Sequence, residues 1–95
     1  MGLDGRTEKR IMKVVPVRLV VAEEGSVAEQ AITVNVSRHG ARLKTQRKWK
    51  PGERPRVAKE RSQVPMEAKV VYCEPLPEGR FCVGLEIRPG HIDWG

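Results

Sequence analysis

Apolar and polar residues alternate along most of the chain with a period of two, which is typical of β-strands. The first such segment runs from Ile11 to Ala22, and its alternating apolar positions are Val15, Val17, Leu19 and Val21. This pattern predicts one long, mostly buried strand. Pro16 lies within it and has no N–H group to donate, so we expect an edge position or a β-bulge at that point.

Further strands are expected at spacings of about ten residues. The segments that show the pattern are 30–36, 41–43, 54–59, 65–73 and 81–88. In the first of them Ile32, Val34 and Val36 share one face, which we expect to face the core. Turn signals separate the strands at 23–26, 51–52 and 75–79.

The number of strands and the short turns between them predict a small all-β barrel or sandwich. No segment has a sustained period of 3.6 residues, so the pattern does not predict a long helix. A closed sheet is favoured because a short domain cannot leave long strand edges open.

The composition agrees with one small folded domain. The chain has 95 residues, and 23 of them are Leu, Ile, Val or Phe, which is enough for a small core. No apolar run approaches the roughly 20 residues of a membrane span, and the first ten residues are polar, so neither a membrane segment nor a signal peptide is expected. Cys73 and Cys82 are interpreted as two separate thiols in a reducing, cytoplasmic setting, with a disulfide across a hairpin as the less favoured alternative.

The net charge of +6 is unevenly distributed. Residues 38–69 carry a net charge of +8, and residues 1–18 add +3. A surplus of this kind is compatible with binding to phosphates or to an acidic protein. Trp49 lies among these cations, where it would be either a stacking platform or, as we favour, a cover over the open end of a barrel.

Residues for catalysis or metal binding are scarce. His39 and His91 are the two histidines, and the chain has no HExxH, paired CxxC, GxSxG or phosphate-binding GxxxxGK[ST] motif. The two histidines and the two cysteines lack the close spacing of zinc ligands. The sequence therefore predicts a chain that is not an enzyme and holds neither a metal nor a cofactor.

Two short motifs remain. Arg6 and Arg10 form an RxxxR before the first strand, and residues 35–40 read (D/N)xSxxG with Asn35, Ser37 and Gly40. If Val34 and Val36 face the core, Asn35 and Ser37 face outward. Gly40 then allows either a positive φ or a close approach of a ligand to the backbone.

A hairpin places the two motifs together. The chain runs away from Arg10 along 11–22 and returns along 30–36, so Asn35 and Ser37 are predicted to lie near Arg10. Guanidinium groups bind phosphate oxygens in pairs of hydrogen bonds, and they also bind the O6 and N7 acceptors of guanine. The combination predicts a site for a guanine nucleotide that carries phosphates.

In the order and spacing of these motifs, the chain resembles the PilZ domain family over roughly residues 5–88, supported by Pro16-Val17 and Gly84-Leu85. The resemblance implies a six-stranded antiparallel β-barrel with a flexible N-terminal arm and a short C-terminal helix or turn. We expect an arm at 1–10, a barrel at 11–90 and a tail at 91–95.

The resemblance also implies the ligand cyclic di-GMP, a bacterial second messenger. The family's ligand residues match Arg6, Arg10, Asn35, Ser37 and Gly40, with Asn35 at a position where Asp is common. Binding would reorder the arm, and a downstream protein partner would detect the change. The alternatives are a basic barrel that binds nucleic acid or an acidic protein through 38–61, and a PilZ-like adaptor that has lost nucleotide binding.

Overall fold

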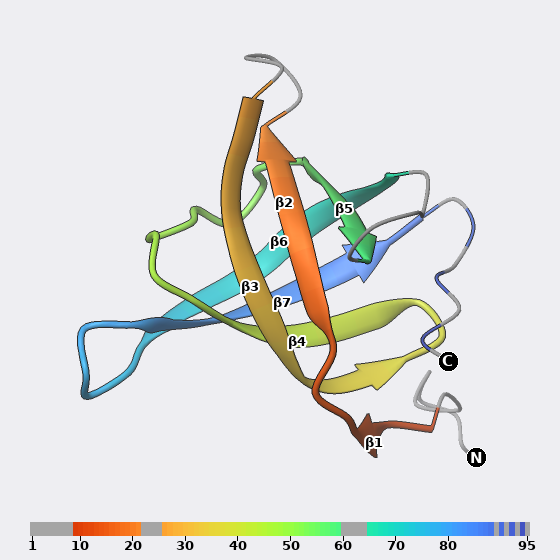
Figure 1. Ribbon diagram of the computed structural model, residues 1–95, viewed down its shortest axis with the longest axis horizontal. Helices are drawn as coiled ribbons and strands as arrows, with labels where there is room; N and C mark the ends of the chain where they lie inside the picture. The colour runs from red at the N-terminus through yellow and green to blue at the C-terminus, as the bar shows by residue number, and fades with distance from the viewer. Residues whose placement is uncertain are drawn as a thin grey trace.

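The computed structural model describes residues 9–21, 26–59, 65–88, 90, 92 and 94 (Figure 1). All of the regular structure in this part of the chain is β-strand, as the sequence predicts. The strands are β1 (Ile11–Met12), β2 (Pro16–Val21), β3 (Ser26–Ser37), β4 (Gly40–Thr45), β5 (Pro55–Lys59), β6 (Met66–Pro75) and β7 (Phe81–Ile87).

Six of these strands close into an antiparallel barrel. Their order is β3-β2-β5-β6-β7-β4, and pairing of β3 with β4 completes the ring. The seventh strand, β1, lies outside the ring and pairs with the end of β3 (Figure 1). Closure leaves few open edges in a domain of this size. The predicted six-stranded barrel is therefore confirmed.

The turns follow the Gly and Pro signals of the sequence. Gly52 has a φ of 97° in the turn after Pro51, and Gly79 has a φ of 81° in the hairpin between β6 and β7. Both values fall in the left-handed region, which a residue with a Cβ atom rarely adopts. The turn predicted at 23–26 lies almost entirely outside the described residues.

The long strand predicted at 11–22 is split into β1 and β2, and a side-chain hydroxyl group pairs with the backbone between them. Pro16 begins β2, where its missing N–H group costs no ladder bond. Between the two strands the buried Thr33 hydroxyl accepts a hydrogen bond from the Val15 N–H at 2.7 Å and donates one to the Lys13 carbonyl at 2.6 Å. The break therefore leaves these backbone groups paired.

The prediction that Ile32, Val34 and Val36 form one core face is wrong for the first two. Val36 is buried, but Ile32 is 39% exposed and Val34 is half-buried. Before the bend in β3 it is Thr33 that faces the core. The register of β3 against β4 shifts between Thr33 and Asn35, so one extra residue reverses the alternation. Figure 1 shows β3 bending at this end of the barrel.

The core combines small aliphatic side chains from the strands with large side chains from segments outside them. The barrel interior holds a cluster of small aliphatic side chains, among them Val17, Leu19, Leu43, Val57, Val70, Val83, Leu85 and Ile87. Trp49 is 1% exposed and belongs to the same cluster. Ile92 and Trp94 are also buried in it, although the sequence analysis assigns 91–95 to a tail. The C-terminal helix or turn of the prediction lies largely outside the described residues, which at this end are 90, 92 and 94.

The two cysteines are free thiols on opposite faces of the sheet. Cys73 is paired with Val83, while Cys82 is paired with Glu74. Residues that face each other across an antiparallel ladder point to the same side, so Cys73 and Cys82 point to opposite sides. This arrangement agrees with the interpretation as two separate thiols and does not allow a disulfide.

Candidate functional site

The structure brings the second arginine of RxxxR to the (D/N)xSxxG motif. Pairing of Met12 with Asn35 and of Ile11 with Val36 carries the chain alongside the end of β3. The Arg10 guanidinium Nη1 then donates a hydrogen bond to Asn35 Oδ1 at 2.7 Å. Arg10 is exposed and Asn35 is half-buried. The predicted proximity of Arg10 and Asn35 is therefore present in the structure.

Ser37 and Gly40 lie next to this pair. They close the β3–β4 hairpin as a matched pair, with residues 38 and 39 forming the turn. A Cβ atom at Gly40 would lie 3.3 Å from Ser37 Oγ and 3.6 Å from Arg10 Nη2. Ser37 lies on the opposite face of the ladder from the core residues Val36 and Ala41, but it is only 7% exposed, so neighbouring groups cover it. Arg6 lies outside the described residues, as does most of the predicted arm.

The close packing at Gly40, and not its backbone conformation, explains why a glycine suits this position. Glycines with a positive φ in the described part of the chain are Gly52, Gly79 and Gly90, so Gly40 does not need left-handed backbone. A Cβ atom there would also lie 3.2 Å from the Leu85 carbonyl oxygen, which is a tight contact. The absence of a side chain at Gly40 therefore lets Ser37, Arg10 and the Leu85 carbonyl pack closely around this position.

The C-terminal end of the chain supports the motif from the core side. Trp94 Nε1 donates a hydrogen bond to the Ser37 carbonyl at 2.8 Å, and this bond is buried. Burial of an unpaired carbonyl would be costly, so Trp94 stabilises the backbone of the hairpin at the motif. No local sequence pattern indicates this bond, because 57 residues separate the two partners.

An arginine and a tyrosine outside both motifs extend the polar surface. Arg42 is paired with Asn35 across β3 and β4, and Gly84 is paired with both Arg42 and Tyr72. Arg42 Nε donates a hydrogen bond to Tyr72 Oη at 2.7 Å, and its guanidinium carbon lies 5.9 Å from the ring centroid. The hydrogen bond to the Tyr72 hydroxyl raises the pKa of Arg42, which stays protonated.

Arg42 could have been placed on the outer face from the sequence. Ala41 and Leu43 flank it and are apolar, so the alternation of a strand directs Arg42 outward. Its pairing with Asn35 could not be read in the same way, because the bulge in β3 sets the register.

Trp49 is buried in the barrel and contacts the side chains of Glu29 and Arg47. The indole Nε1 donates a hydrogen bond to Glu29 Oε1 at 3.2 Å, and the Arg47 guanidinium carbon lies 4.2 Å from the centroid of the indole. Because Trp49 is buried under these groups, it is not a platform on which a base can stack. Burial of Trp49 in the core cluster agrees with the favoured interpretation as a cover.

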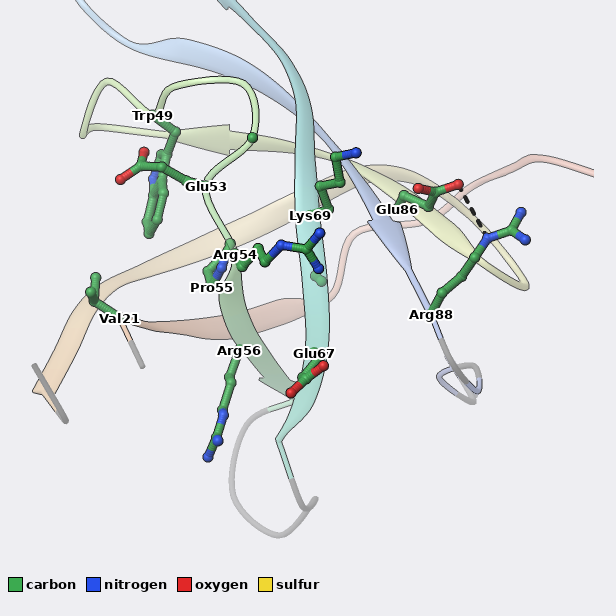
Figure 2. Close-up of a pocket in the computed structure, with 12 residues that line it drawn as sticks. Val21, Trp49, Glu53, Arg54, Pro55, Arg56, Glu67, Lys69, Glu86 and Arg88 are labelled. Atoms are coloured by element: carbon green, nitrogen blue, oxygen red, sulfur yellow. Dashed lines mark ion pairs between the residues drawn. The ribbon is translucent and has the colours of Figure 1, made fainter. Parts of the chain in front are cut away.

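A pocket of about 670 Å³ is lined by none of the motif residues, although Glu86 in its lining pairs with Gly40 (Figure 2). Its lining mixes cations with carboxylates, and the Glu86 carboxylate pairs with Arg88 at 3.1 Å. Figure 2 shows the Arg54, Arg56 and Lys69 side chains along this wall, with Glu67 on the same strand as Lys69. Mixed charge suits a doubly charged anion less well than the motif surface does.

The family comparison matches the PilZ domain over residues 4–93, which is almost the whole chain. The chain belongs to the PilZ domain family. PilZ domains bind cyclic di-GMP as a ligand, and the family consists of receptor and adaptor domains. The comparison with curated proteins finds none that matches the chain.

Among the solved structures that match, we compare the chain with one of similar fold. It is the Bacillus subtilis inhibitor of motility, MotI/DgrA, with a TM-score of 0.73 and 20% sequence identity. The match covers 93% of this chain and 44% of MotI/DgrA, so this chain spans less than half the length of that protein. At this identity the likeness concerns the fold.

Neither a metal-binding cluster nor a membrane-spanning helix is found among the described residues of this PilZ domain. Within them no three or more His, Cys, Asp or Glu side chains gather as a group able to hold a metal ion. The same part of the chain contains no helix of the length and apolarity needed to cross a membrane.

Proposed function

We propose that this chain is a cyclic di-GMP receptor that relays ligand binding to a partner protein. One observation carries the proposal. The 2.7 Å hydrogen bond between Arg10 and Asn35 joins two motifs that are 25 residues apart in sequence, and Ser37 and Gly40 lie beside it. An exposed guanidinium next to amide and hydroxyl groups suits an anion that also has hydrogen-bonding edges.

Each group has a role that follows from its chemistry. The Arg10 fork can bind two phosphate oxygens or the O6 and N7 atoms of guanine. Asn35 offers both an acceptor oxygen and an NH₂ donor to a base edge. Gly40 lets the Ser37 hydroxyl and the Arg10 guanidinium pack closely beside it, and Arg6 would add a second guanidinium from the arm.

The relay would follow from the exchange of hydrogen bonds at Arg10. A ligand that binds the Arg10 guanidinium would compete with Asn35 for the same N–H groups. Arg10 and the chain next to it would then change position. Met12 is 81% exposed and Val14 is 70% exposed, and both follow Arg10 closely in sequence. Movement of Arg10 would therefore alter an apolar surface that a downstream protein can contact.

We also propose that the chain is non-catalytic and acts in the cytoplasm. Membership of a family of receptor and adaptor domains supports the first statement. Free thiols at Cys73 and Cys82, which lie on opposite faces of the sheet, fit a reducing compartment.

The test is a calorimetric titration of the chain with cyclic di-GMP, with GTP as the control ligand. We expect binding of cyclic di-GMP, loss of most of it in Arg10→Ala, and near wild-type binding in Lys9→Ala. Lys9 is a matched control because it is an adjacent exposed cation at a variable position of RxxxR. Absence of heat from the wild-type chain at about 10–100 μM cyclic di-GMP would contradict the proposal and favour the adaptor alternative.

Binding of nucleic acid or of an acidic protein through residues 38–61 has less support. Arg47 pairs with Glu53 at 3.5 Å and lies over Trp49, so the aromatic group of this stretch is covered. Stacking on aromatic side chains supplies much of the affinity for single strands. If nucleic acid does bind, replacement of Lys48, Arg54 and Arg56 should abolish it, whereas Arg10→Ala should not.

A further inference from the structure

A row of paired residues crosses four strands on the outer face of the barrel beside the motif residues. Cross-strand pairing places Asn35, Arg42, Gly84 and Tyr72 opposite one another on β3, β4, β7 and β6. Arg10 bonds to Asn35 at one end of this row. Paired residues of an antiparallel sheet lie about 4.5–5.5 Å apart at Cα, so Arg42 stands directly next to Asn35.

The guanidinium of Arg42 is held in place although it is exposed. Its Nε group donates to Tyr72 Oη at 2.7 Å, and the Tyr72 ring lies over Gly84, where a Cβ atom would overlap the ring carbons. Gly84 therefore lets the ring lie flat against the sheet. The bond to the Tyr72 hydroxyl restricts the rotamers of Arg42. Arg42 would therefore lose less conformational entropy on ligand binding than an unrestrained arginine.

The bond to Tyr72 uses only one of the N–H donors of Arg42. An arginine has five N–H donors, and the bond to Tyr72 uses the one on Nε. Arg10 and Arg42 therefore flank Asn35 from the β1 side and from the β4 side. Neither the RxxxR motif nor the (D/N)xSxxG motif includes Arg42.

We propose that Arg42 is a further ligand-binding residue of the cyclic di-GMP site, held in position by Tyr72. This inference rests on the proposed function. The acceptor bound by Arg42 is an oxygen or nitrogen of the nucleotide part next to Asn35, either a phosphate oxygen or the O6/N7 edge of guanine. Both present the paired acceptors that a guanidinium fork recognises.

The first experiment compares Arg42→Ala, Arg42→Lys and Arg80→Ala in calorimetric titrations with cyclic di-GMP. Arg80 is an exposed arginine of the β6–β7 hairpin, and Figure 1 shows this hairpin at the left, across the barrel from the β3–β4 hairpin. We expect affinity to fall about tenfold or more in Arg42→Ala, less in Arg42→Lys, and not at all in Arg80→Ala. If the wild type binds and Arg42→Ala binds within twofold of it, the inference is overturned. A wild type that does not bind overturns the proposed function itself.

Cyclic di-AMP distinguishes the two acceptors, because it shares the phosphates of cyclic di-GMP and lacks guanine O6. If Arg42 binds phosphate, Arg42→Ala weakens both ligands by the same factor. If it binds the guanine edge, the variant loses part of the preference for cyclic di-GMP. Either result supports the inference, which fails only when neither affinity changes.

The positioning role of Tyr72 needs a separate measurement. Tyr72→Phe retains the ring over Gly84 and removes the hydroxyl that accepts the bond from Arg42. We expect a severalfold loss of affinity at an unchanged melting temperature, and no further loss when Tyr72→Phe is added to Arg42→Ala. An equal loss in both backgrounds would show that Tyr72 does not act through Arg42.

Discussion

Arg10 and Asn35 are joined by a 2.7 Å hydrogen bond between a guanidinium and a side-chain amide oxygen. The bond fixes the chain before β1 against the end of β3 and brings together the two motifs of the sequence. Because both partners also belong to the proposed ligand site, the residue at position 35 influences both the free and the bound state.

Replacement of Asn35 by aspartate should strengthen cyclic di-GMP binding. A carboxylate accepts two N–H groups of a guanine edge at once, whereas the amide of Asn35 has one acceptor atom. Hydrogen bonds to a charged group are also stronger by about 1 kcal/mol. We expect the affinity of Asn35→Asp to rise by roughly fivefold in calorimetric titrations. A lower affinity would show that a stronger bond to Arg10 in the free chain outweighs the gain.

A methyl group at Gly40 should impair binding more than folding. The Cβ atom would meet the Leu85 carbonyl oxygen at 3.2 Å and Ser37 Oγ at 3.3 Å, with the Arg10 guanidinium beyond them. We expect Gly40→Ala to cost about 1–3 kcal/mol of unfolding free energy, measured in urea, and to remove most of the cyclic di-GMP binding. Binding that matches the wild type would exclude a close approach of the ligand at this glycine.

The strands and their closure into a barrel could be predicted from the sequence, and the register could not. Apolar residues at alternate positions, such as Leu19 and Val83, mark segments with one buried face. The extra residue in β3 depends on how that strand pairs with β4, which is why Ile32 was wrongly placed in the core. No local pattern of apolar and polar residues indicates where the register of a strand shifts.

The same limit applies to the candidate site. The return of β3 beside the chain near Arg10 followed from the hairpin, so the proximity of Arg10 to Asn35 was predictable. The contact between Arg42 and Tyr72 spans 30 residues and passes over Gly84 of a third strand. Only the three-dimensional pairing of β4, β7 and β6 places these side chains together.

The break between β1 and β2 should depend on the hydroxyl of Thr33. Thr33→Val retains the shape of the side chain but leaves the Val15 N–H and the Lys13 carbonyl without this partner. We expect a loss of about 1–3 kcal/mol of unfolding free energy in urea. Thr45→Val is the matched control, because the equally buried Thr45 hydroxyl donates one bond, to the Arg47 carbonyl at 2.9 Å. A loss in Thr33→Val no larger than that of the control would contradict the bridging role.

The buried bond from Trp94 to the Ser37 carbonyl should link the C-terminal end of the chain to the ligand site. Trp94→Phe retains an aromatic ring and removes the donor that pairs with Ser37 at 2.8 Å. We expect a loss of about 1–2 kcal/mol of stability and a severalfold weaker affinity for cyclic di-GMP, because the hairpin that carries Ser37 loses its support from the core.

Trp49→Phe provides the comparison for this last prediction. It also removes an indole donor, in this case the one paired with Glu29 at 3.2 Å, and Glu29 lies in the first half of β3 while Ser37 ends that strand. Both variants should therefore lose stability in urea, and only Trp94→Phe should lose affinity in the calorimeter. If the two variants bind cyclic di-GMP equally well, Trp94 stabilises the barrel without supporting the ligand site.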